Sequence, residues 1–121
     1  MIADDDLSKH IDMVALNELK DVMEEEFPIL LETFIEDSQL RLEDMRKAVE
    51  NAESDDLLRS AHSFKGSCGN IGAFHLSELC KQAEDMGRSA KLDQAKDLML
   101  GIETEYACIR EILENELRAA H

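Results

Sequence analysis

The sequence predicts an all-α protein: an antiparallel up-down four-helix bundle with an additional short N-terminal helix. Its 121 residues include one proline and five glycines, so few residues interrupt a helix. Apolar residues recur at spacings of three and four in successive segments, and no segment shows the alternation that is typical of a strand. Because the segments are long and the turns between them short, neighbouring helices should run antiparallel.

The first quarter of the chain combines an acidic start with a short helix. Residues 1–11 are acidic and are expected to be frayed, whereas residues 12–121 are expected to form the bundle domain. An amphipathic helix is predicted over residues 12–23. A long helix should then begin at Phe27-Pro28, because proline suits the first helical position and the preceding acids complement the helix dipole. It should run to about Ala52 along one apolar stripe, formed by Leu31, Phe34, Ile35, Ser38, Leu42, Met45 and Val49.

Three more helices complete the predicted bundle. Ser54 and the acids after it are interpreted as the cap of a third helix, which Gly72 ends. A fourth helix is predicted over residues 74–88, where a Gly-Arg-Ser sequence breaks it, and a last helix over residues 92–118. The chain has only four phenylalanines and one tyrosine, so we expect a mostly aliphatic core.

The charge of the chain excludes several kinds of partner. The formal net charge is −15, which disfavours nucleic acids and anionic membranes because both require a cationic surface. Residues 59–92 are different, since they contain five Lys or Arg against three Asp or Glu. No signal peptide or membrane-spanning stretch is visible, and three cysteines in apparent helices indicate reduced thiols. We therefore expect a cytoplasmic protein.

The segment His62-Ser-Phe-Lys65-Gly66 is the most informative part of the chain. Gly66 and Gly69 follow His62 by four and seven residues, so all three lie on one helix face. Each glycine inside a helix costs roughly 1 kcal/mol relative to alanine. This loss of stability indicates a reactive imidazole that another protein must approach closely.

The predicted turn at Gly72 brings a second set of polar residues near this histidine. Folding the two middle helices together places His62 opposite position 82, within reach of Lys81, Gln82, Glu84, Asp85 and Arg88. A hydrogen-bond acceptor there could hold one imidazole nitrogen and leave the other as a nucleophile. Lys65 and Arg88 could place cations beside an anion on the ring.

These groups suit a phosphoryl group carried on histidine. The chain has no glycine-rich phosphate loop and no strand-borne aspartate cluster for Mg²⁺. ATP-dependent kinase activity is therefore not predicted, and another protein would supply both the phosphoryl donor and the metal.

The run from Ala61 to Ser67, followed by Gly72-Ala73, Leu76, Cys80, Glu84 and Gly87-Arg88, resembles the signature of histidine-containing phosphotransfer (HPt) domains. The likeness extends over the whole predicted helix order. It implies a phosphorelay intermediate in which His62 accepts a phosphoryl group from an aspartate of a hybrid-kinase receiver domain. His62 would pass that group to an aspartate of a response regulator.

The resemblance also implies roles for single residues. Lys65 would stabilise the phosphoryl oxygens, Gly66 would give the partner room, and Glu84 matches the position that orients the imidazole, where some members have Gln. Arg88 would assist the site, or would form a surface ion pair with Glu84 instead. Partner-binding positions are expected to be Leu58, Arg59, Gly69, Lys81 and Asp85.

The remaining expectations concern cofactors, oligomeric state and other functions. The protein itself should need no cofactor, with Mg²⁺ held by the partner receiver domain, and it should be a monomer. A non-catalytic helical module that binds receiver or regulatory proteins without phosphorylation is the main alternative. A metal-carrying bundle is a remote third, because no Glu-x-x-His pair is present and Cys68, His75 and Cys80 lack zinc-ligand spacing.

Overall fold

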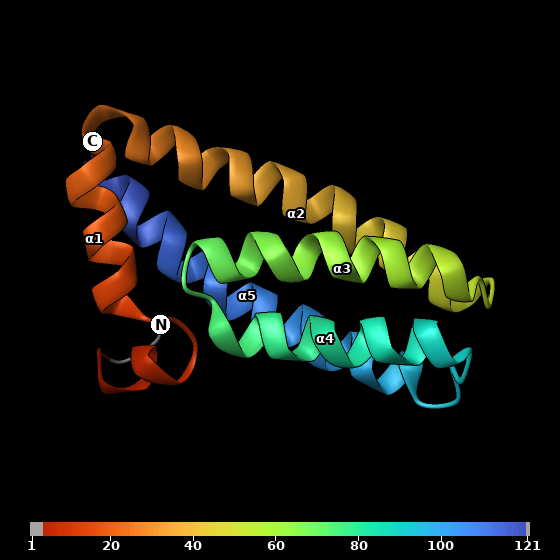
Figure 1. Ribbon diagram of the computed structural model, residues 1–121. Helices are drawn as coiled ribbons and strands as arrows, with labels where there is room; N and C mark the ends of the chain where they lie inside the picture. The colour runs from red at the N-terminus through yellow and green to blue at the C-terminus, as the bar shows by residue number, and fades with distance from the viewer. Residues whose placement is uncertain (1–3, 121) are drawn as a thin grey trace.

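The computed structural model describes residues 4–120, and all regular structure within them is helical. Four long helices lie side by side, and α1 crosses one end of them (Figure 1). Their order confirms the predicted four-helix bundle with an additional N-terminal helix. The elements in chain order are η1 (Asp4–Lys9), α1 (Met13–Met23), η2 (Glu24–Glu26), α2 (Phe27–Glu50), α3 (Ser54–Asn70), α4 (Phe74–Ser89) and α5 (Ala95–Ala120).

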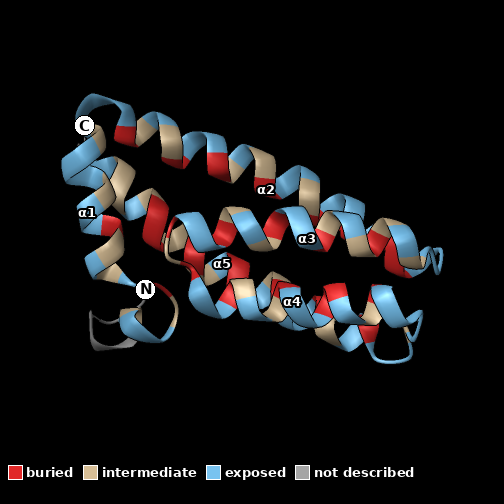
Figure 2. Ribbon diagram, in the orientation of Figure 1, coloured by how far each residue is buried: buried red, intermediate tan, exposed pale blue. Residues whose placement is uncertain are grey.

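The core occupies the space between α2, α3, α4 and α5, where buried positions line the inner side of each helix (Figure 2). Phe64 is fully buried near the middle of the bundle. Its ring centroid lies 6.2 Å from that of Phe34 and 6.3 Å from that of Tyr106, within the range of favourable aromatic pairs. The other buried side chains are almost all aliphatic, as the composition predicts.

Most predicted helix boundaries are confirmed to within a few residues. Asp12 caps α1 by accepting a hydrogen bond from the Ala15 amide at 3.1 Å, and proline lies in the first turn of α2. The prediction for Ser54 is wrong, because Ser54 is already helical and Glu53 occupies the cap position without a side-chain bond. The last helix begins at Ala95 rather than at residue 92, since Ala90 adopts φ +57° and the chain uses the next residues to turn.

The N-terminal segment departs from the expectation of a frayed end through residue 11. Ile11 is fully buried, and the Asp12 amide donates to the Gly72 carbonyl at 2.8 Å. His10 lies 2.9 Å from both carboxylate oxygens of Glu105 on α5. The bundle therefore begins before residue 12, because Ile11 is part of the core and Leu7 packs against it. Residues 1–3 lie outside the described residues.

Candidate functional site

The site is built on the α3–α4 hairpin, whose two helices make the most extensive contact in the molecule. Gly87 is fully enclosed where the helices cross. A methyl group at its Cα would lie 2.7 Å from the Leu58 nitrogen and 2.8 Å from the Ser54 carbonyl oxygen. Because glycine allows this close backbone approach, side chains on the facing helix surfaces can reach one another directly.

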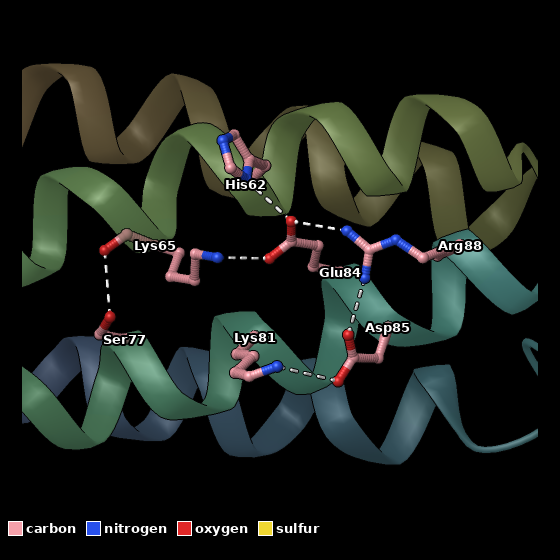
Figure 3. A network of polar contacts seen from close by, with 7 residues as sticks. All are labelled: His62, Lys65, Ser77, Lys81, Glu84, Asp85 and Arg88. Carbon is pink, nitrogen blue, oxygen red and sulfur yellow. Dashed lines mark hydrogen bonds and ion pairs between the residues drawn. The ribbon is translucent and has the colours of Figure 1, made fainter.

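His62 stands on α3 at the edge of this hairpin, and its side chain is 66% exposed. Its Nδ1 atom lies 2.7 Å from Oε2 of Glu84 on α4. The ring's other nitrogen points away from Glu84 (Figure 3). The carboxylate therefore fixes the orientation of an imidazole that is otherwise open to an approaching molecule.

Glu84 is the centre of the network, with a side chain only 5% exposed. Besides the His62 ring, it accepts a hydrogen bond from Lys65 Nζ at 2.7 Å and one from Arg88 Nη2 at 3.1 Å. The Lys65 hydrogen bond is the main reason that the pKa of this carboxyl falls from 4.5 to about 2, with the His62 bond adding to it against the effect of burial. Glu84 is thus a carboxylate at any physiological pH.

The outer part of the network has one hydrogen bond between α4 and α3 and further ion pairs within α4 (Figure 3). Ser77 Oγ donates to the Lys65 backbone carbonyl at 3.1 Å. Asp85 accepts from Arg88 at 3.0 Å and lies 3.5 Å from Lys81 Nζ. Ser77 was not among the predicted site residues, although its position one helical turn before Lys81 places it on the same face of α4.

Known proteins match this chain in both sequence and fold. A family model described as the Hpt domain matches residues 29–120. Histidine-containing phosphotransfer protein B from Pseudomonas aeruginosa PAO1 is 37% identical, with a TM-score of 0.88 over 91% of this chain and 96% of that chain. The chain belongs to the Hpt domain family. A phosphotransfer role in a phosphorelay follows from this membership.

A second solved structure shows the same fold at lower identity. Histidine-containing phosphotransfer protein MtHPt2 from Medicago truncatula is 21% identical, with a TM-score of 0.76 over 96% of this chain and 80% of that chain. Among curated proteins, no sequence matches significantly. No helix within residues 4–120 is both long and apolar enough to cross a membrane.

The structure of this Hpt protein brings most of the predicted site residues together. His62, Lys65 and Arg88 all contact Glu84, so the four residues form one connected group in which Arg88 makes the predicted ion pair with Glu84. A methyl group on Gly66 would meet nothing within 4 Å, which leaves open space beside His62.

The predicted partner-binding residues surround this group in different ways. Gly69, Lys81 and Asp85 are exposed on the hairpin, whereas Leu58 is half-buried under the Gly87 crossing. Arg59 is exposed and forms an ion pair with Asp56 within α3. Leu58 and Arg59 therefore lie outside the network around Glu84.

Proposed function

We propose that His62 is the phosphoacceptor of a phosphorelay intermediate, and that Nε2 is the atom that bears the phosphoryl group. The observation that carries this proposal is the bond from Nδ1 to the buried Glu84, which leaves Nε2 on the exposed side of the ring. A carboxylate on Nδ1 holds the proton there, so Nε2 keeps the lone pair that a nucleophile requires.

The transfer step balances without an external base. The Nε2 lone pair attacks the phosphorus of a partner's aspartyl phosphate, and the bond between phosphorus and the aspartyl oxygen breaks as the carboxylate leaves. The imidazole becomes positively charged while Nδ1 keeps its proton. Glu84, 2.7 Å from Nδ1, stabilises that charge. The reverse sequence passes the group to another aspartate.

Two cations are placed to assist this step. Lys65 and Arg88 both contact Glu84, and their side chains are 31% and 60% exposed. Phosphoryl transfer depends mainly on positioning and on neutralising the charge of the phosphoryl oxygens. We propose that Lys65 turns from the carboxylate to the phosphoryl group once His62 is modified, and that Arg88 remains to hold Glu84.

The partners proposed are receiver domains of hybrid sensor kinases and of response regulators. Such a partner would supply the aspartate and its Mg²⁺, so the Hpt chain would need no cofactor and no ATP. Open space at Gly66 would admit the rim of the partner's active site. Gly69, Lys81 and Asp85 are exposed beside it and would form the adjoining contact surface.

The test is phosphotransfer from phosphorylated receiver domains to the wild type, to His62→Gln and to His75→Gln. His75 is an exposed histidine at the start of α4 and serves as the matched control. Wild type and His75→Gln should both take up an acid-labile, base-stable label, and His62→Gln should take up none. Long-range proton–nitrogen spectra of the labelled ring should show phosphorus on Nε2.

Label on His62→Gln would overturn the assignment. If the wild type binds receivers but accepts no label from any receiver of its own organism, the non-catalytic module becomes the better description.

A further inference from the structure

A second cluster of reactive side chains lies away from the α3–α4 hairpin, where the N-terminal segment meets α5. It consists of His10, Glu105 and Cys108. One nitrogen, one carboxylate oxygen and one sulfur from these residues all lie within 4.8 Å of one another. Within the described part of the chain, this is the group of three that has metal-ligand spacing.

The cluster is held in place by the fold rather than by chance surface contact. Glu105 and Cys108 are three residues apart on α5, so they project from the same face of one helix. His10 comes from the opposite end of the sequence, and its position is fixed by the buried Ile11 and by the bond from the Asp12 amide to Gly72. Two independent segments therefore supply the three groups.

Burial distinguishes the cluster from an ordinary surface ion pair. The Glu105 side chain is 7% exposed and that of His10 is 21% exposed, and Cys108 is half-buried. Nδ1 of His10 lies at 2.9 Å from both oxygens of Glu105, so the imidazole already faces the carboxylate symmetrically. A buried carboxylate requires a nearby positive charge or a metal ion.

We propose that His10, Glu105 and Cys108 bind a zinc ion, with water as the fourth ligand. Zinc takes nitrogen, oxygen and sulfur ligands in a tetrahedron at about 2.0–2.3 Å, which corresponds to about 3.3–3.8 Å between ligand atoms. The ligand atoms here lie within 4.8 Å of one another, and Nδ1 of His10 lies 2.9 Å from the Glu105 oxygens, so the side chains would move to reach that spacing. A mixed imidazole, carboxylate and thiolate set favours zinc or cobalt over magnesium or calcium.

The charges and protons of the binding step balance. Cys108 loses its thiol proton to solvent and binds as thiolate, and a neutral His10 binds through Nδ1, the nitrogen that faces Glu105, with its proton on Nε2. With one carboxylate and one thiolate, the divalent ion gives a site of zero net charge. Zinc would thus link the N-terminal segment to α5 in a chain whose formal net charge is −15.

Cobalt(II) is the probe that tests this proposal, because a thiolate ligand gives it a near-ultraviolet charge-transfer band. Carboxylates elsewhere on this acidic surface can bind cobalt but give no such band. Cys68 and Cys80 are fully buried in the core and are out of reach. The reduced full-length wild type should show the band at one equivalent of cobalt, and zinc should abolish it.

The variants give the decisive comparison. Cys108→Ser should lose the band, and His10→Ala and Glu105→Gln should weaken cobalt binding by at least about tenfold. His75→Ala, which removes an exposed histidine elsewhere, should bind as the wild type does. Far-ultraviolet circular dichroism establishes that each variant is folded. Absence of the band in the wild type, or an unchanged band in His10→Ala, would overturn the proposal.

Discussion

At the scale of single residues, the site depends on one buried carboxylate that contacts three other side chains. Glu84 orients His62 and is itself held by Lys65 and Arg88. Because the hydrogen bond from Lys65, and next the one from His62, lower the pKa of Glu84 against the effect of burial, the carboxylate can remain ionised at 5% exposure. The same charge then faces the imidazole, where a positive charge would develop on phosphorylation.

This arrangement predicts a specific pH dependence of stability. The pKa of Glu84 is about 2 in the folded chain and 4.5 ordinarily, so its ionic contacts contribute fully above about pH 5. That contribution is lost as the pH falls toward 2. Urea midpoints of the wild type and of Glu84→Gln should therefore differ most near neutral pH and converge on acidification.

Glu78→Gln, which changes an exposed glutamate of the same helix, is the control for that titration. The urea midpoint of Glu78→Gln should stay close to that of the wild type throughout the pH range. If the urea midpoints of the wild type and Glu84→Gln differed by the same amount from neutral pH to pH 3, the assigned contacts of Glu84 would be contradicted.

Gly66 gives a prediction in which stability and function change in opposite directions. Neither Gly66 nor Gly101 has any atom within 4 Å of an added methyl group, and both lie inside helices. Substitution by alanine should therefore stabilise each helix by about 0.5–1 kcal/mol. Only Gly66→Ala should also slow phosphotransfer, because only Gly66 lies beside His62. Thermal unfolding and transfer rates measured on both variants check this, and equal transfer rates would remove the role proposed for Gly66.

At the scale of elements, the α3–α4 crossing determines whether the site can assemble. Gly87 lies against the Leu58 backbone, so alanine would have to push the two helices apart. We expect Gly87→Ala to lower the free energy of unfolding by about 1–3 kcal/mol. It should also weaken the Glu84 contacts, and transfer should slow at temperatures where the variant remains folded. Urea denaturation measures the first effect, with Gly101→Ala as the control that should not be destabilised.

The sequence predicts these elements well and their detailed contacts less well. Apolar spacing identifies every long helix, because each must bury one stripe. The predicted turn at Gly72 also places Glu84 among five residues within reach of His62. It does not reveal that Glu84 is buried while Asp85 is exposed, since that depends on the rotation of α4 about its axis. The role of Gly87 in the crossing is equally invisible until the helices are placed.

At the scale of the whole molecule, the N-terminal segment completes the bundle. An acidic sequence predicts fraying, yet a single side chain, Ile11, is fully buried. Sequence periodicity misses such a residue because Leu7 and Ile11 form only one pair of apolar positions, which is too short to make a stripe. The pairing of His10 with Glu105, 95 residues away, likewise has no local signal.

Removal of this covering side chain should destabilise the entire bundle. Ile11→Ala is expected to lower the free energy of unfolding by about 2–5 kcal/mol, the range for large-to-small changes in a core. Ile29→Ala is the matched control, because that isoleucine is 62% exposed. Chemical denaturation of both variants distinguishes the outcomes, and equal stabilities would show that residue 11 belongs to a loosely attached end after all.

All seven residues of the polar network come from two consecutive helices, α3 and α4, within residues 54–89 (Figure 3). The residues of the proposed phosphotransfer site are therefore encoded by one contiguous segment of the gene. Helices α2 and α5 complete the core behind it and contribute no side chain to the network. Descendants of such a gene can alter α2 and α5 and still inherit the reactive surface unchanged, provided that the buried faces remain apolar.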